Sequence, residues 1–138
     1  MTNEAVKVEL YGQNNDGDPR RYTCASGVAI AKNTLLSLAD PRTAAKATTA
    51  GSAIAGISSM AKSATDYSTS ISAWTNGIFE LKASGAITVG FPVISAADAT
   101  NAQNTVMSAT DGASGAMVIG YALETASDAD TINVRLAL

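Results

Sequence analysis

The sequence predicts a mainly β protein: a small single-domain β-barrel or sandwich with an extended N-terminal arm and at most one or two short helical turns. The longest stretch of alternating polarity, residues 69–93, contains the only Trp and both Phe residues. Short apolar stretches separated by turn-forming residues recur along the rest of the chain. Much of the 46% hydrophobic fraction is Ala, with only 5% aromatic residues, so the core must be thin, as in a small barrel or sandwich.

Residues 1–24 are expected to form an N-terminal arm and a turn-rich tether, followed by a barrel body at 25–138. Apolar and polar side chains alternate over residues 6–11, which predicts a short strand. Residues 13–19 are dense in turn formers and separate this strand from the body. Two placements of the strand stay open, because it can either add to an edge of another protein or pair within its own barrel.

The Asn and Asp residues of this tether do not form a calcium loop, because their spacing does not alternate and no Glu closes the loop. A plain turn is therefore expected. Arg20 and Arg21 follow as a lone basic pair, which is typical of a solvated or interface position.

Three apolar stretches in the first half predict strands, at 28–31, 35–38 and 53–57. Between them, Asp40 and Pro41 have the character of a helix N-cap and a proline at the first helical position. One or two helical turns are therefore expected over residues 42–47. Residues 60–67 are expected to form a polar connection.

The central stretch places one uniform apolar face at alternate positions from Ile71 to Leu81. Asn76-Gly77 also fits a two-residue hairpin turn. A hairpin there would put apolar and charged side chains on the same face, so we predict a continuous strand with a bulge or close packing at Gly77. The opposite face is polar apart from Trp74 and Ile78, which are predicted to be exposed and to contact another subunit.

Strands are also predicted to begin at 86–89 and to occupy 117–121 and 131–138, with a surface loop over 95–104. The two halves of the chain resemble each other. Residues 30–36, 55–57 and 71–75 align with residues 87–93, 119–121 and 132–136. An internal duplication and a chance match of short apolar patterns stay equally open at this point.

The formal charge of −3 and a pI near 4.7 argue against a nucleic-acid or anionic-membrane partner, which would need clustered Lys and Arg. Beyond Lys82 the only basic residue is Arg135, against five acidic ones. The first ten residues carry Glu4 and Glu9 and no apolar segment, so no secretory signal is expected. No run approaches the roughly 18 apolar residues that span a bilayer, so a reducing, soluble compartment is expected.

The sequence offers no catalytic residue, cofactor site or metal site. It has no His, the commonest general base, and a single cysteine, Cys24, which is expected to be buried and inert. The carboxylate pairs Asp16/Asp18 and Asp128/Asp130 lie in turn sequences, where carboxylates are usually solvated. Lys62 follows Met60-Ala61, a weak match to the lysine of a biotinyl or lipoyl carrier.

Four segments together resemble capsid decoration (cement, head-stabilising) proteins of tailed bacteriophages. These segments are Trp74-Thr-Asn-Gly-Ile-Phe-Glu-Leu, Ala86-Ile-Thr-Val-Gly-Phe-Pro-Val, Val118-Ile-Gly-Tyr-Ala-Leu-Glu-Thr-Ala and Ile132-Asn-Val-Arg-Leu. The resemblance implies a virion protein made in the host cytoplasm that trimerises on the outer capsid surface and stabilises the shell. It implies the major capsid protein and its own copies as partners, no nucleic acid or membrane partner, no catalysis and no cofactor.

In such proteins the N-terminal arm contacts the shell, and the residues of this chain that would do so are Val6, Val8, Leu10, Tyr11, Arg20 and Arg21. The alternative function is that of a carbohydrate- or ligand-binding β-module, such as an adhesin of a phage tail or cell surface. It requires a groove with clustered aromatic residues, and Trp74 is far in sequence from the four Tyr residues. An enzyme is the third and most distant hypothesis.

Overall fold

The computed structural model describes residues 5–10, 19–96, 104–109 and 117–138. Within these ranges the chain forms strands and no α-helix, so no helix there is long and apolar enough to cross a membrane. This confirms the predicted mainly β fold. The strands are β1 (Val6–Glu9), β2 (Arg20–Thr23), β3 (Leu35–Ala39), β4 (Thr43–Lys46), β5 (Ile54–Ser58), β6 (Ser70–Trp74), β7 (Asn76–Ala83), β8 (Pro92–Ser95), β9 (Thr105–Ser108), β10 (Gly120–Ala122) and β11 (Thr131–Ala137).

The first half of the chain closes into a five-stranded barrel with the strand order β2-β4-β3-β5-β6. β2 runs parallel to β4, with Thr23 opposite Thr43, and every other neighbouring pair is antiparallel. The interior holds mostly small side chains, which suits the predicted thin core. They are Cys24, Ile30, Leu36, Ala44, Ala55, Ile71 and Ala73.

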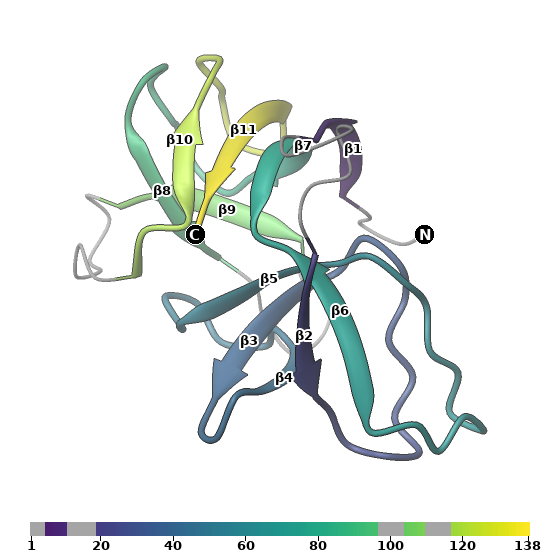
Figure 1. Cartoon of the computed structure of the whole chain (residues 1–138). Helices are drawn as coiled ribbons and strands as arrows, with labels where there is room; N and C mark the ends of the chain where they lie inside the picture. Colours follow the sequence, from purple (N-terminus) through teal and green to yellow (C-terminus); the bar gives the residue numbers. More distant parts are fainter. Residues whose placement is uncertain (1–4, 11–18, 97–103, 110–116) are drawn as a thin grey trace.

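The second half forms another closed set of five strands, in the order β7-β11-β10-β8-β9. A parallel pairing of β7 with β9, through Lys82 and Thr105, closes this barrel. β1 adds to the outer side of β7 as a sixth, antiparallel strand. Figure 1 shows the two barrels one above the other, with the chain passing between them where β6 leads into β7.

The two barrels have the same topology, strand for strand, from β2 and β7 to β6 and β11. Gly56 lies opposite Leu36 in the first barrel, and Gly120 lies opposite Val93 in the second. Isolated bridges join Ile30 to Lys62 and Ile87 to Ala126 at corresponding places. These pairs reproduce the alignment of the two halves made from the sequence, so the internal duplication is confirmed.

The second barrel holds larger side chains at three of the seven equivalent interior positions. Its seven interior residues are Ala83, Ile87, Val93, Val106, Ile119, Ile132 and Val134. Three alanines of the first barrel, Ala44, Ala55 and Ala73, thus correspond to branched residues in the second. The partly buried Tyr22 packs against the smaller core. The duplication therefore preserves the strand pairing while the core packing differs.

A single hydrophobic cluster joins the barrels into one domain. The Trp74 ring lies against Phe79, with centroids 5.8 Å apart. The backbone N–H of Leu35 donates a 2.7 Å hydrogen bond to Asn104 Oδ1 across the junction. The N–H of Gly51 donates to the carbonyl oxygen of Ser95 at 2.8 Å.

The central stretch is not the one continuous strand that the sequence predicted, because it divides at Thr75 into β6 of the first barrel and β7 of the second. β6 pairs with β2 and β5, and β7 with β1, β9 and β11, so the rejected hairpin at Asn76-Gly77 is absent. The predicted helical turns over 42–47 are wrong. Residues 43–46 form β4 instead, because pairing with β3 places Ala44 in the barrel interior.

Besides β4, two strands fall outside the sequence prediction, and the stretches 28–31 and 86–89 that were predicted as strands contribute only isolated bridges, at Ile30 and Ile87. β2 was expected to be part of the tether, and β9 directly follows the predicted loop at 95–104. Both are four residues long and polar or mixed in composition, so they lack the alternation that marks β11. Each is a strand because it pairs with other strands when its barrel closes, and a local sequence pattern cannot predict such pairing.

Candidate interaction surfaces

The described residues contain no group of three or more His, Cys, Asp or Glu side chains that could hold a metal ion. Cys24 is buried, as expected, with its sulfur 3.8 Å from the carbonyl oxygen of Ser68. Lys62 is also buried, and its ammonium group donates to the carbonyl oxygens of Ala25 and Val28, at 3.0 Å each. It closes a loop of the first barrel and is not presented as a carrier lysine would be.

The carboxylates of the β10–β11 turn act as hydrogen-bond acceptors for nearby backbone. Asp128 accepts from the N–H of Gly85 at 2.8 Å, and Asp130 accepts from the N–H of Ser127 at 2.9 Å. Both are exposed, as expected for turn carboxylates. Asp16 and Asp18 lie outside the described residues. Asp128 and Asp130 thus stabilise turns at the surface and do not form an acid–base pair in a cleft.

β1 pairs with β7 of its own chain, which answers the placement left open by the sequence. Its Val6 and Val8 side chains are 49% and 50% exposed. Lys7 lies with its ammonium 5.0 Å from the centroid of the Trp74 ring, and Leu10 packs against the core. Tyr11 lies outside the described residues. On its other side, β1 pairs with no strand in the part of the chain that the structure describes.

The predicted exposure of Trp74 is wrong, because the side chain is only 5% exposed. β6 belongs to the first barrel, and the outer face of its C-terminal end is covered by the second barrel. The alternation correctly placed Trp74 on the outer face of β6, but this face contacts the second barrel and not solvent. Ile78 is half-buried and pairs with Arg135. Its subunit contact stays a prediction.

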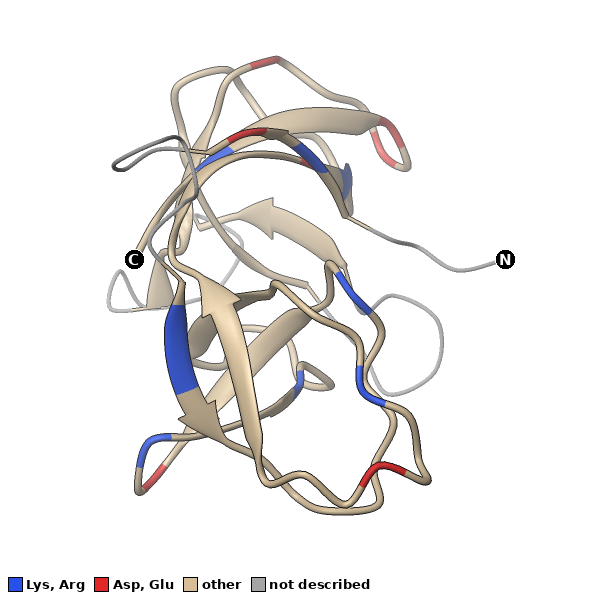
Figure 2. Ribbon diagram, turned by 45° about the vertical axis from the view of Figure 1, so that its right-hand side comes forward, with Lys and Arg blue, Asp and Glu red and all other residues tan. Residues whose placement is uncertain are grey.

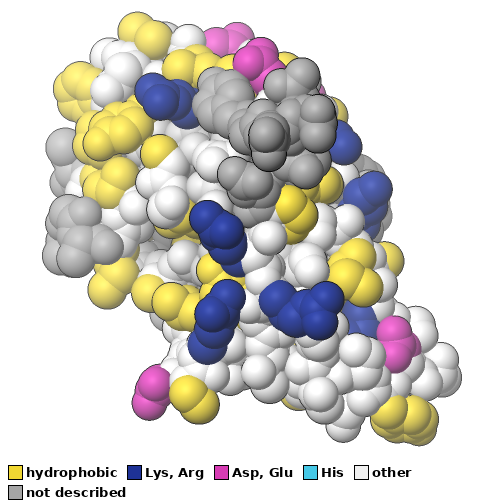
Figure 3. All heavy atoms as spheres, viewed as in Figure 1, with side chains coloured by type: hydrophobic (Ala, Val, Ile, Leu, Met, Phe, Trp, Pro, Cys, Tyr) yellow, Lys and Arg dark blue, Asp and Glu magenta, His cyan; other side chains and the backbone are white. Residues whose placement is uncertain are grey.

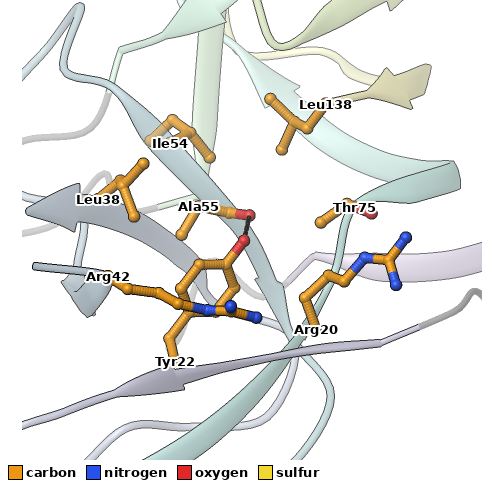
Figure 4. Close-up of a pocket in the computed structure, with 8 residues that line it drawn as sticks. All are labelled: Arg20, Tyr22, Leu38, Arg42, Ile54, Ala55, Thr75 and Leu138. Carbon is orange, nitrogen blue, oxygen red and sulfur yellow. Dashed lines mark hydrogen bonds between the residues drawn. The ribbon is translucent and has the colours of Figure 1, made fainter.

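A hollow of about 420 Å³ opens on the first barrel (Figure 4). Its lining residues are Arg20, Tyr22, Leu38, Arg42, Ile54, Ala55, Thr75 and Leu138. The Tyr22 hydroxyl donates to the carbonyl oxygen of Ala55 at 3.2 Å, which fixes the ring. The Arg42 guanidinium lies 5.7 Å from the ring centroid, and its Nε donates to the carbonyl oxygen of Arg21 at 3.0 Å. The hollow therefore combines an apolar floor with two guanidinium groups.

An apolar surface lies on the second barrel, over β8 and β10. Phe91 and Tyr121 are 44% and 46% exposed, and Val89 and Leu123 beside them are also exposed. Tyr121 is the pairing partner of Pro92, and the N–H of Ala122 donates to the carbonyl oxygen of Phe91. The hydrophobic side chains over β8 and β10 gather at the upper left of Figure 3. Contiguous exposed apolar groups of this kind mark contact sites.

The two barrels carry opposite charge. Residues 19–75 contain six Lys or Arg and two Asp or Glu, whereas residues 76–138 contain two Lys or Arg and six Asp or Glu. Figure 2 shows the basic residues of β2 and the neighbouring loops on the first barrel and acidic residues on the loops of the second. The charge asymmetry noted in the sequence therefore coincides with the boundary between the barrels.

The features found among the described residues are surfaces suited to protein contact, which are typical of a structural, assembly-type protein. A family model described as phage cement protein matches residues 14–138. The chain belongs to this family of capsid-associated structural phage proteins, and the predicted resemblance is confirmed.

Among solved structures, the chain is similar to the head fiber gp8.5 N base of bacteriophage phi29. The TM-score is 0.52 at 13% sequence identity, over 86% of this chain and 94% of that one. At this identity the likeness concerns the fold alone. No curated protein matches the sequence.

Proposed function

We propose that this protein binds the outside of the assembled phage capsid as a trimer and stabilises the shell, with the major capsid protein as its partner and without catalysis. The observation that carries the proposal is the match to the cement family over nearly the whole chain. The exposed surfaces support it, because each is suited to protein contact: the edge strand β1, the basic hollow and the apolar surface over β8 and β10.

The shell contact is assigned to β1 and to Arg21. An edge strand with a free side accepts a further strand through main-chain hydrogen bonds, and alternate side chains then give specificity. Val6 and Val8 are exposed alternate side chains of β1, and Arg21 adds charge from β2, whose Arg20 lines the hollow. Since Leu10 packs against the core, its part is to hold the strand in place.

Trimerisation makes the attachment strong without any single strong contact. Once one subunit has bound, the contacts of the other two become effectively intramolecular. A modest contact on each subunit then holds the trimer firmly, and a trimer that bridges several shell proteins opposes their separation.

The test is binding of the purified protein to capsids that lack it, measured by co-sedimentation. Val6→Asp/Val8→Asp should lose binding, because buried carboxylates without partners are costly. Val28→Asp, an exposed valine of the first barrel, is the matched control and should bind as wild type does. Retention of capsid binding by the β1 variant would contradict this assignment of the shell contact, and failure of the wild-type protein to bind would contradict the function itself.

The alternative is a carbohydrate-binding module, and one observation favours it: Phe91 and Tyr121 are exposed on neighbouring strands. They lie on an open surface, however, whereas the hollow on the first barrel is lined by Tyr22 as its only aromatic residue. Glycan binding by the isolated chain that is lost in Tyr121→Ala would support this alternative.

A further inference from the structure

Because the two barrels share one topology, each surface that is buried in one barrel can be compared with the equivalent surface of the other. Inside the chain, the first barrel contacts the second through an outer face that includes Leu35, Ile57 and Trp74, here called the joining face. The second barrel meets it with a face here called the receiving face. The receiving face consists of Phe79, Ser95, Asn104 and Leu136.

The joining face has an equivalent on the second barrel, and it is exposed. Ile57 pairs with Trp74 as Tyr121 pairs with Arg135, and Leu35 corresponds to Pro92. Ile57 and Leu35 are fully buried at the junction, whereas Tyr121 and Arg135 are exposed and Pro92 is half-buried. The apolar surface over β8 and β10 thus corresponds to the joining face, and within the described chain no other barrel covers it.

The receiving face also has an equivalent, on the first barrel. Arg20 opposite Ala73 corresponds to Phe79 opposite Val134. The carbonyl oxygens of Arg42 and Asn104 accept equivalent hydrogen bonds, from the N–H groups of Thr23 and Lys82. By the same strand pairings, Leu38 corresponds to Ser95 and Thr75 to Leu136.

All four equivalents on the first barrel line the hollow: Arg20, Leu38, Arg42 and Thr75. The chain therefore carries an open joining face on the second barrel and an open receiving face on the first. Repeats of this kind bury their faces by stacking on the next unit.

We propose that a second copy of this chain docks head to tail, with the joining face of its second barrel seated on the receiving face of the first barrel. This repeats between chains the contact made within each chain. The inference rests on the proposed trimer and gives it an interface. Because the contact is heterologous, three copies close as a ring of six barrels when the rotation permits.

The side chains at the two open faces are suited to a contact between separate chains. Guanidinium groups stack on aromatic rings, and the hollow presents Arg20 and Arg42 to a surface that carries Phe91 and Tyr121. The net positive charge of the first barrel and the net negative charge of the second also favour head-to-tail association. Arg135 takes the place of Trp74, however, and Arg20 that of Phe79, so two like-charged guanidinium groups meet where two rings pack within the chain. This repulsion should make the contact weaker than the internal one.

The test uses two variants, one for each face, and measures molar mass in solution without capsids. Tyr121→Asp breaks the joining face, and Leu38→Asp breaks the receiving face. Each should weaken self-association about 30-fold or more, the loss expected at an interface hot spot. Tyr67→Asp and Val28→Asp, at exposed positions in loops of the first barrel, are the matched controls and should associate as wild type does.

Mixing the two variants is the decisive step. Each retains one intact face, so a head-to-tail contact predicts a heterodimer that contains one chain of each variant and grows no further. A heterodimer also establishes that both variants are folded. A monomeric wild-type protein at high concentration, unchanged association of both variants, or the absence of the heterodimer would overturn the proposal. Capsid binding is measured separately, so a failure of the shell-binding function is distinguished from a failure of this interface.

Discussion

Gly120→Ala tests the role of close backbone approach in the fold. A Cβ at residue 120 would overlap the carbonyl oxygen of Arg135 on the neighbouring strand β11 and crowd the Cα of Leu136. These are backbone atoms of the β10–β11 ladder, in which Gly120 pairs with Leu136, so no side-chain rotation relieves the overlap. The equivalent Gly56 meets the carbonyl oxygen of Trp74 in the same way. The duplication thus retains a glycine at both places.

The expected cost is about 3 kcal/mol, the upper part of the range for overpacking. With an unfolding entropy of about 2.1 cal/mol/K per residue, this loss in a chain of 138 residues lowers Tm by about 10 °C. Thermal unfolding followed by circular dichroism measures it. Gly90→Ala is the control, because φ is +85° there and a Cβ meets nothing within 4 Å. It should cost only the left-handed backbone penalty of about 1–2 kcal/mol. A Gly120→Ala protein no less stable than Gly90→Ala would refute the steric argument.

Three further predictions concern buried polar groups and the thiol. Lys62→Met should destabilise the protein by about 1–3 kcal/mol in urea unfolding, because it leaves the carbonyl oxygens of Ala25 and Val28 without their donor. Lys32→Met, on the exposed surface, is the control and should have little effect. Asn104→Ala should cost a similar amount by removing the acceptor for the Leu35 N–H, and no measurable loss of stability would argue against this hydrogen bond. Cys24 should react with a thiol reagent only as fast as the first barrel opens, and rapid labelling of the native protein would contradict its burial.

The sequence predicted what local periodicity encodes. The apolar face from Ile71 to Leu81 is buried as expected, and β11 shows the same alternation. The alignment of the two halves was also correct, because corresponding strands keep the same hydrophobic and glycine positions. These features depend on neighbours in the sequence.

The features that the sequence did not predict depend on contacts between the barrels and between strands far apart in the chain. Trp74 was expected to be exposed because its neighbours on that face are polar, yet the second barrel covers it. β2 and β9 each close a barrel through a parallel pairing with a distant strand, which short polar segments do not reveal. The hollow and the apolar surface arise in the same way, from strands brought together by closure. In the sequence, only the internal repeat points to these surfaces, and using it requires knowing which residues of the two barrels pair with which.

The proposed shell-stabilising role requires that the protein decorates the capsid in many copies. The most direct measurement is its copy number in purified particles, by quantitative mass spectrometry against the major capsid protein. Near-equimolar amounts are expected if trimers cover the shell. A handful of copies for each particle, or none, would contradict a shell-wide stabilising role.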